Sequence, residues 1–216
     1  IKLTPKNKNL PRVKIKFYPT QSQALEALKI GEIKVATVSQ ASSLQSWPNL
    51  EVEKTFDQTE VITIFYNNDD PLLSSKEFRQ ALNYAINRQE FDGVFAQSPI
   101  YPSSWAFNEA VKGYDYNSGK AKELISKSQI ENPQVTLTVG PALEEIADRI
   151  ANDWEAIGVK VVIKKEKTVP SEFQALLAVN ELPQDPDQYA LWHSTQIKTN
   201  ITKYKNVRID KLLEDA

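Results

Sequence analysis

The alternation of apolar and polar positions predicts a strand, a helix and a second strand at the start of the chain. Apolar and basic residues alternate over residues 13–18, which is the period of a half-buried strand, and Pro19 ends the run. After Ser22, which can cap a short helix, apolar residues recur at helical spacing until Gly31 closes the element. A second strand is predicted over residues 33–38, so the three elements form one unit.

The next pattern is a pair of strand-like runs followed by a well-marked helix. Residues 51–56 and 61–66 are suited to one long strand with an interruption between them. Ser74 and Glu77 then have the spacing of a capping box, and apolar residues at helical spacing follow them. The pattern therefore predicts a helix over residues 74–88 with one buried face.

The second half of the chain alternates helices and strands. A helix is predicted over residues 117–126, and a strand over residues 135–139. A long amphipathic helix over residues 141–157, ended by Gly158, separates that strand from another at residues 159–165. This order is that of a right-handed crossover between parallel strands, which indicates an α/β fold.

Two stretches lack such a regular period. Residues 91–116 contain several prolines and Trp105, and they predict a long irregular surface segment. From Pro170 onward the pattern predicts a short helix, a turn rich in Pro and Asp at residues 183–187, and a final helix over residues 208–215.

Composition and charge exclude several classes of protein. The chain of 216 residues has 41% hydrophobic and 25% charged residues, an ordinary globular composition. No run approaches the roughly 20 apolar residues that cross a bilayer. The net charge of -2, with Lys and Arg scattered, argues against nucleic acid as a partner. The absence of Cys excludes disulfides, thiolate nucleophiles and cysteine-based zinc sites. Because the chain starts at Ile1 without any Met and stops inside a predicted helix, we expect a piece of a longer protein.

Two groups of residues have potential chemistry, and each also has a simpler structural explanation. His193 lies next to Ser194, but no nucleophile elbow is present and adjacent strand residues point to opposite faces, which argues against a hydrolase. Asp185 and Asp187, with His193, are metal-ligating types without a recognised spacing, and Pro186 indicates a turn instead. We therefore expect no catalytic residue, no resident metal and no cofactor.

Four segments, in order along the chain, carry a resemblance to a known family. They are LKIGEIKVA (28–36), FYNNDDPLLSSKEFRQALNYAINRQEF (65–91), YDYNSGKAKELI (114–125) and DPDQYALWHSTQ with NVRIDKLLEDA (185–216). The second is the most specific, through Phe78, Arg79, Gln80, Ala81, Leu82, Ala85, Ile86 and Arg88. Together they resemble the bacterial extracellular solute-binding proteins of family 5, the oligopeptide- and dipeptide-binding components of ABC importers.

The resemblance implies an α/β fold of the type II periplasmic-binding-protein kind, in which a ligand is trapped between two lobes joined by strands. Residues 1–60 would be a partial segment of lobe one, and residues 61–216 would be lobe two without its C-terminal return. The resemblance also implies a substrate-binding component, not an enzyme, that captures peptides or a similar small solute outside the cytoplasmic membrane. Such a protein would be periplasmic or lipid-anchored and monomeric, and it would present its ligand to the permease subunits.

The family alignment also implies where the ligand would lie. The expected ligand-binding residues follow the second strand, line the hinge strand or precede the Pro-rich turn: Thr37, Ser39, Gln40, Thr63, Phe65, Asn67 and Asn180. Trp105 joins them because it lies among Pro, Ser and Tyr rather than in an apolar stripe. Each of the seven has an alternative role as a strand-end residue that satisfies a turn. Trp154 and Trp192 are expected in the core.

Two departures from the family pattern bear on the ligand. Lys34 stands where the family commonly has Asp. The best-known peptide binders place an aromatic residue and then an acid before the Pro-rich turn to hold the peptide's amino group, whereas residues 179–182 here are Val, Asn, Glu and Leu. Two alternatives therefore stay open: a solute-binding sensor or interaction module, and a binder of a non-peptide solute such as an oligosaccharide or a nickel chelate.

Overall fold

The chain forms two compact units, Ile1–Thr55 and Phe56–Ala216. The computed structural model describes residues 2–3, 9, 12–38, 44, 47–48 and 50–216. The division between the units falls within a few residues of the lobe boundary that the sequence predicts. The assignment of the two units to two lobes stays a prediction.

The first unit is built around one short helix. Helix α1 (Gln21–Lys29) begins after Thr20, whose hydroxyl oxygen accepts a hydrogen bond from a backbone N–H in the first turn. It ends before Gly31, which has a φ of 77° and so takes the left-handed conformation that stops a helix. Strands β1 (Lys2–Leu3) and β2 (Val13–Lys14) form a two-residue antiparallel ladder.

The strands predicted on either side of α1 are largely wrong. Only two residues of the run at 13–18 belong to β2, and residues 33–38 form no strand. Several apolar side chains of these runs face solvent, with Phe17 75% and Val35 84% exposed. Backbone groups of a strand need a paired neighbour, and among the described residues only β1 and β2 pair in this unit. Alternation alone therefore does not make these segments strands.

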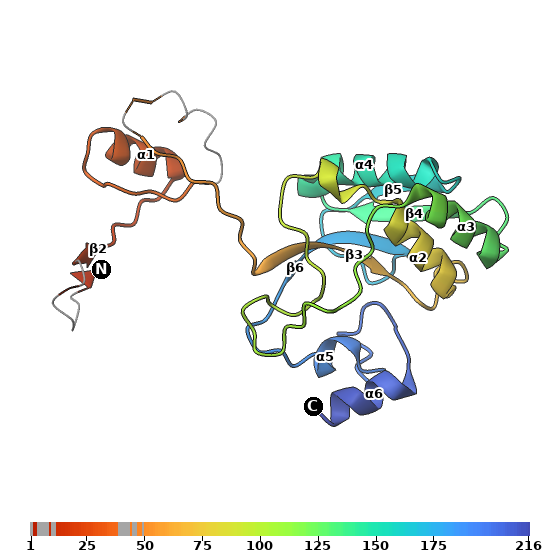
Figure 1. Ribbon diagram of the computed structural model, residues 1–216. Helices are drawn as coiled ribbons and strands as arrows, with labels where there is room; N and C mark the ends of the chain where they lie inside the picture. Colours follow the sequence, from red (N-terminus) through yellow and green to blue (C-terminus); the bar gives the residue numbers. More distant parts are fainter. Residues whose placement is uncertain (1, 4–8, 10–11, 39–43, 45–46, 49) are drawn as a thin grey trace. The chain divides into compact units, whose positions relative to one another are not determined.

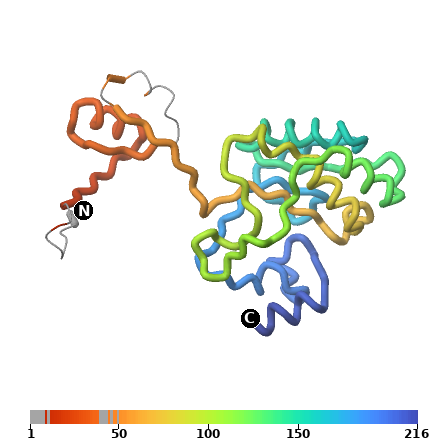
Figure 2. Tube along the Cα trace, viewed as in Figure 1, coloured from red at the N-terminus to blue at the C-terminus, as the bar shows by residue number. Residues whose placement is uncertain are grey.

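The second unit contains a four-stranded sheet in the order β3-β6-β4-β5 (Figure 1). Its strands are β3 (Glu60–Tyr66), β4 (Gln134–Val139), β5 (Lys160–Lys165) and β6 (Ala175–Glu181). Strand β6 pairs antiparallel with β3 and parallel with β4, and β4 pairs parallel with β5. Figure 2 shows β3 and β6 side by side although they are far apart in the sequence.

The sequence pattern does not predict β6, which is the largest difference between expectation and structure. Its sequence, ALLAVNE, has few β-branched residues and locally favours a helix. Pairing on both sides overrides this preference, and Leu176 and Leu177 are buried on opposite faces with 3% and 1% exposure. Residues 51–56, expected to be strand, form none and are exposed.

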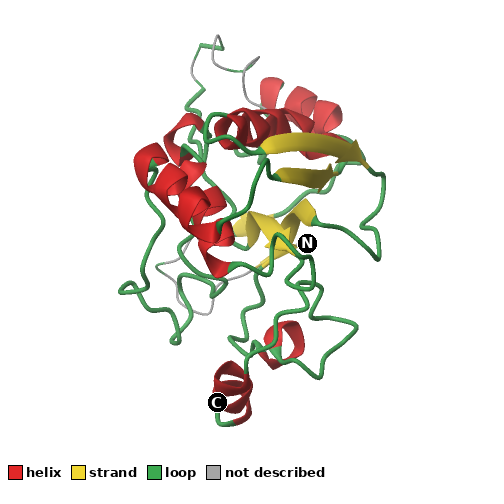
Figure 3. Cartoon of the chain, turned by 90° about the vertical axis from the view of Figure 1, so that its right-hand side faces the viewer, coloured by secondary structure: helices red, strands yellow, loops and turns green. Residues whose placement is uncertain are grey.

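Three helices cover one face of the sheet (Figures 1 and 3). They are α2 (Lys76–Ala85), α3 (Ser118–Ser128) and α4 (Glu144–Glu155), with short 3₁₀ turns η1 (Arg88–Glu90) and η2 (Pro141–Leu143). Ser75 and Asn117 cap α2 and α3 with oxygens that accept backbone N–H bonds. The predicted cap, Ser74, is one residue away, and its hydroxyl donates to the carbonyl of Pro71 instead.

The core lies between these helices and the sheet. Trp154 of α4 is fully buried, and its indole N–H donates to the carbonyl of Leu82 in α2 at 3.1 Å. Its ring centroid lies 6.4 Å from that of Tyr66 in β3. Phe78 and Leu137 are also fully buried here. The prediction that Trp154 belongs to the core is confirmed.

The C-terminal segment, residues 182–216, lies on the other side of the sheet from these three helices (Figures 1 and 3). It contains the short helix α5 (Tyr189–Trp192) and the final helix α6 (Val207–Glu214), the latter close to its predicted range. Residues 91–116 contain no helix or strand, as predicted. Among the described residues, no helix is long and apolar enough to cross a lipid bilayer.

Replacing Trp154 by Ala should strongly destabilise the full-length protein. The change removes a fully buried indole and its hydrogen bond, and we expect a loss of about 3–5 kcal/mol in the free energy of unfolding. Trp105→Ala is the matched control, because that side chain is 88% exposed and should shift stability by less than about 0.5 kcal/mol. Urea unfolding followed by circular dichroism measures both, and equal effects would contradict the assignment.

Candidate functional site

Three predicted ligand residues lie on one face of the β3–β6 pair. Neighbouring residues of a strand point to opposite faces, and Ile64 packs into the helical core, so Thr63 and Phe65 point to the other side. Asn180 of β6 is opposite Val61 in the ladder, and opposed residues share a face. Thr63, Phe65 and Asn180 therefore face the side of the sheet that carries the C-terminal segment.

Asn180 lies near the carboxyl end of β6, where the connectivity of the sheet changes direction. The chain passes from β4 to β5 on one side and then returns to β6 on the other side of β4. In open α/β sheets, ligands bind outside the carboxyl ends of strands at such a point. The Asn180 side chain is half-buried and has no hydrogen bond to a described residue. Its amide is thus a donor and an acceptor available to a ligand.

A pair of like charges lies at the same end of the ladder. Glu60 and Glu181 are directly opposite each other and both are exposed. Like charges in this position destabilise an antiparallel pair. The next pair on the same face of the ladder, Ile62 and Val179, leaves apolar side chains 47% and 51% exposed. Local features that oppose stability are expected where a protein serves a function.

A hollow of about 280 Å³ extends along β3. One wall consists of four consecutive residues, 63–66. Residues 63–66 all belong to β3, so this strand forms one continuous side of the hollow. The remaining wall residues are Asn68, Arg79, Trp192, Thr202 and Tyr204. Trp192, expected in the core, is therefore a half-buried wall residue of this hollow.

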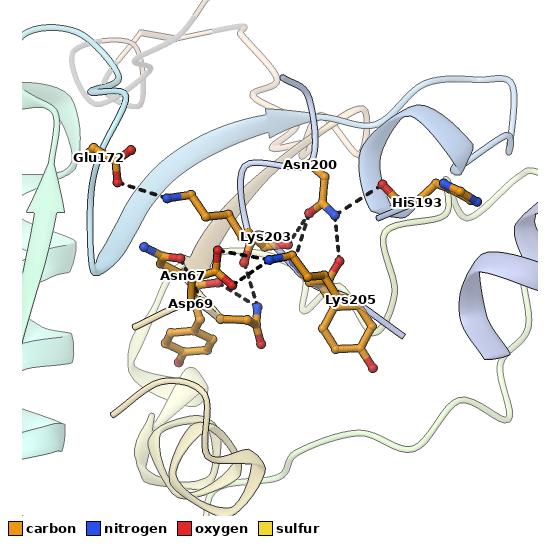
Figure 4. Close-up of polar contacts among 11 residues, drawn as sticks. Asn67, Asp69, Glu172, His193, Asn200, Lys203 and Lys205 are labelled. Carbon is orange, nitrogen blue, oxygen red and sulfur yellow. Dashed lines mark hydrogen bonds and ion pairs between the residues drawn. The ribbon is translucent and has the colours of Figure 1, made fainter. Parts of the chain in front are cut away.

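One buried amide fixes much of the wall that the C-terminal segment supplies (Figure 4). Asn200 is 3% exposed, and its NH₂ group donates to the carbonyls of Trp192 at 3.3 Å and Tyr204 at 2.8 Å. Its oxygen accepts from the hydroxyl of Thr202 at 2.9 Å and the N–H of Tyr204 at 3.2 Å. The same NH₂ group also lies 3.5 Å from the carbonyl of His193. Trp192, Thr202 and Tyr204 line the hollow, so Asn200 positions these three residues without lining it.

A second amide ties this segment to the end of β3. The Asn68 side chain donates to the carbonyls of Tyr66 at 3.1 Å and Thr202 at 2.9 Å, and its backbone N–H donates to Thr202 as well. Lys205 and Asp69 add an exposed ion pair at 3.1 Å, which contributes little to stability. The hydrogen bonds, more than the ion pair, hold the segment against the strand.

The wall of the hollow includes one cationic residue, Arg79, and one tyrosine of β3, Tyr66. The Arg79 guanidinium donates to the carbonyls of Leu73 and Ser74, and burial lowers its pKa without making it neutral. Burial raises the pKa of the Tyr66 phenol, which stays protonated. The Tyr66 hydroxyl is buried and has no hydrogen-bond partner among the described residues.

The other predicted ligand residues are distributed more widely. The Asn67 amide makes the turn after β3: its NH₂ donates to the carbonyl of Phe173 and its oxygen accepts from the N–H of Asp69. Trp105 is 88% exposed in the irregular segment. Asn67 therefore has a structural role in the turn, whereas the Trp105 side chain is accessible to solvent.

Three of the predicted ligand residues, Thr37, Ser39 and Gln40, belong to the first unit. Thr37 is exposed and lies outside any helix or strand. Ser39 and Gln40 lie outside the described residues. Asn68 and Asn200 were not predicted, because they lie in polar stretches where no period or motif marks a structural amide.

His193 and Ser194 have separate structural partners. The N–H of Thr195 donates to Nδ1 of His193 at 3.2 Å, and Nε2 of His193 lies 3.3 Å from the Glu214 carboxylate. The backbone N–H and the hydroxyl of Ser194 donate to Asp210, and these bonds lower the pKa of the Asp210 carboxyl. These contacts attach α6 to α5, and they do not form a serine–histidine pair.

The two aspartates near this histidine form turns. Asp185 accepts the backbone N–H of Asp187 at 3.1 Å, and Asp187 accepts that of Tyr189 at 2.8 Å. Such turns lead the chain into α5. Within the described part of the chain, no group of three or more His, Cys, Asp or Glu residues is placed to hold a metal ion.

Most of the chain matches one protein family. Residues 4–197 match the family described as bacterial extracellular solute-binding proteins, family 5 Middle. The chain belongs to this family. Family 5 is described as extracellular, which agrees with the location outside the cytoplasm that the sequence implies.

Individual family 5 relatives agree with this assignment. The oligopeptide-binding protein AppA of Bacillus subtilis is 26% identical, with 96% of this chain and 45% of the relative covered. The structure of AppA from Bacillus subtilis with a nonapeptide has a TM-score of 0.70 at 24% identity, covering 92% of this chain and 47% of that one. NikZ from Campylobacter jejuni, in complex with Ni(L-His), has a TM-score of 0.65 at 24% identity, covering 95% and 48%.

These similarities confirm the type II periplasmic-binding-protein fold and its α/β class. The chain spans about half the length of the curated relatives it matches, AppA among them. The part of the family 5 fold described here consists of a unit with a four-stranded sheet and a smaller unit.

Replacing Asn200 by Ala should loosen the wall of the hollow. The change leaves buried groups of Thr202 and Tyr204 without their partner, and we expect a loss of about 1–3 kcal/mol in stability. Backbone amides of residues 192–204 should exchange faster with deuterium. Asn180→Ala is the control, because that half-buried amide has no bond to lose; unchanged exchange in Asn200→Ala would refute the positioning role.

Reversing one charge of the Glu60–Glu181 pair should stabilise the full-length protein. Glu181→Lys turns a repulsive cross-strand pair into an attractive one, and we expect a gain of about 0.2–1 kcal/mol. Glu60→Lys should give a similar gain, whereas the double reversal restores like charges and should give none. Urea unfolding at low and high salt measures the three variants, and an additive double variant would show that the two side chains do not interact.

Proposed function

We propose that the protein is the solute-binding component of a bacterial ABC importer, and that it captures a peptide or a similar small solute outside the cytoplasmic membrane. It binds its ligand and delivers it unchanged, without catalysing a reaction. It works as a monomer, periplasmic or attached to the outer face of the membrane by a lipid, and presents the loaded form to the permease subunits.

The match to family 5 over residues 4–197 carries this proposal. The name of the Bacillus subtilis relative specifies oligopeptides, and the AppA structure holds a nonapeptide. Peptides are therefore the solute class that the proposal favours. The half-buried amide of Asn180 and the hydroxyl of Thr63 suit the N–H and C=O groups of a peptide backbone.

The proposed mechanism is closure of two lobes on the ligand. Residues 1–60 contribute part of lobe one and residues 61–216 form most of lobe two. A ligand that touches both lobes only in the closed form shifts the population toward that form. The permease then recognises the closed form, so that transport depends on loading.

The ligand contacts come from both lobes in this proposal. Thr63, Phe65 and Asn180 contribute from the β3–β6 face, and Asn67 holds the turn that follows β3. Trp105 contributes an exposed aromatic surface from the irregular segment. Lobe one supplies Thr37, Ser39 and Gln40. An aromatic wall with a few hydroxyl and amide groups is the usual composition of a small-ligand site.

A nickel chelate is the second candidate, because NikZ is solved with nickel and L-histidine. The described residues offer no cluster of metal-ligating side chains. A chelate whose metal is already coordinated by its own ligands would need no metal-ligating side chains from the protein. The two candidates therefore differ in the bound solute and share the fold. A role in sensing would instead use the same closure to signal to a partner domain.

Native mass spectrometry of the full-length protein, purified from its host, tests the proposal directly. A bound peptide supports peptide import, and a nickel–histidine mass supports the second candidate. A protein that arrives empty and binds neither peptides nor nickel chelates would contradict both.

Asn180→Ala and Trp105→Ala should each weaken the ligand found in this way. Loss of a hydrogen bond or of an aromatic contact worth about 1–2 kcal/mol corresponds to roughly 5–30-fold in Kd. Asn152→Ala is the control, since that amide is exposed on α4 and has no side-chain hydrogen bond. Calorimetric titration measures affinity, and unchanged Kd values for both site variants would remove Asn180 and Trp105 from the site.

A further inference from the structure

The irregular segment, residues 91–116, begins at the edge of the sheet where β4 and β6 end. The N–H of Asn87 donates to the Asp153 carboxylate of α4 at 2.9 Å. Slightly further along the chain, Arg149 of α4 donates to the carbonyl of Glu90 at 2.8 Å. The chain therefore runs along α4 toward the N-terminus of that helix, which follows the carboxyl end of β4. Strand β6 is parallel to β4, so both strands end at the edge from which the segment starts (Figure 1).

A single arginine holds two points of this segment that are far apart in the sequence. Arg88 lies in η1, just after α2, and its guanidinium stacks over the ring of Phe95 at 4.7 Å from the ring centroid. The same group donates to the carbonyl of Tyr114 at 2.7 Å and to that of Asn83 in α2 at 3.0 Å. A planar guanidinium can stack on a ring and donate from its edge at the same time. Arg88 therefore attaches both ends of the segment to α2.

The returning end of the segment has further contacts with α2. The ring of Tyr114 lies edge-on to that of Tyr84, with 5.0 Å between the centroids, and its hydroxyl accepts a hydrogen bond from Gln80 at 3.3 Å. The N–H of Asn117 donates to the carbonyl of Tyr84 at 2.8 Å. This end is thus fixed on a helix that packs against the sheet.

The part between the two attachments is bonded only to itself. Among the described residues, every hydrogen bond made by residues 96–111 stays within the segment. Val94, Trp105 and Val111 expose their apolar side chains to solvent. Exposed apolar side chains on a loop favour a role in recognition. A loop that is attached at both ends and free between them is suited to close over a bound molecule.

We propose that residues 95–114 form a strap that closes over the solute at the edge where β4 and β6 end, with Trp105 as the contact, and that Arg88 is the residue that positions it. The proposal rests on the proposed function in solute binding. Arg88 acts through Trp105 and is not itself a ligand contact. By holding both ends, it shortens the free loop and lowers the entropy that closure costs.

Amide hydrogen exchange of the full-length protein, followed by NMR without added solute, tests the attachment. In Arg88→Lys the charge remains, but an ammonium cannot stack on Phe95 and donate within one plane. The N–H of Asn117 should then exchange roughly tenfold faster, the effect of losing one hydrogen bond nearby. Arg79→Lys is the matched control, because that guanidinium also extends from α2 and donates to two carbonyls, both outside the segment. Exchange as slow in Arg88→Lys as in the wild type would overturn the proposal.

A double-mutant cycle tests the action on the solute. The probe is an equimolar mixture of synthetic tripeptides or a nickel–histidine chelate, whichever the wild type binds. Arg88→Lys should raise the apparent Kd roughly 5–30-fold, as Trp105→Ala does. In the Trp105→Ala background, Arg88→Lys should change the Kd by less than about twofold, because the contact that it positions is already gone.

The outcomes separate this proposal from the proposed function. Effects of the two substitutions that add fully, or a Kd unchanged in Arg88→Lys, would overturn the strap and leave solute binding intact. A wild-type protein that binds neither probe would contradict solute binding, and the strap would fall with it, whatever the exchange rate of Asn117.

Discussion

The antiparallel ladder between β3 and β6 joins residues 60–66 to residues 175–181, and the candidate site takes its positions from it. The register places Asn180 opposite Val61 and so brings the amide to the same face as Thr63 and Phe65. It also places Glu60 opposite Glu181. The backbone N–H and C=O groups of Ile62 and Ile64 point away from β6, toward the outer edge of the sheet. A shift by one residue would exchange the two faces and put Asn180 into the helical core.

Elements whose stability is local could be predicted from the sequence. Helix α3 follows from its Asn117 cap and apolar spacing, and α4 follows from its apolar spacing. The parallel pair β4–β5 follows from the crossover pattern. Strand β6 could not be predicted, because its partners on both sides decide its conformation and its own residues do not. Residues 33–38 show the opposite case. Their apolar and polar residues alternate as in a strand, but no described strand pairs with them, and they form no strand.

The residues of the candidate site also differ in whether the sequence could predict them. Thr63, Phe65 and Asn180 came from the family resemblance, and the register brings them to one face. Asn200 and Asn68 position the hollow's wall through backbone carbonyls, and a residue that binds backbone groups leaves no motif in the sequence. Trp192 was expected in the core because aromatic residues beside strands usually are; the open edge of β3 makes it a wall instead.

The position of β6 in the sheet also sets an order of assembly. The crossover β4–α4–β5 can form from contiguous sequence, but β3 has no contact with β4 in the ladder except through β6. Strand β6, which follows β3, β4 and β5 in the sequence, is thus an interior strand of the described sheet, and these four strands cannot all pair before residues 175–181 are available. Pairing over such a sequence separation is slow, so β3, with its apolar run, stays unpaired on both edges early in folding. A chain that must cross a membrane before it folds gains from this delay, because its sheet forms late.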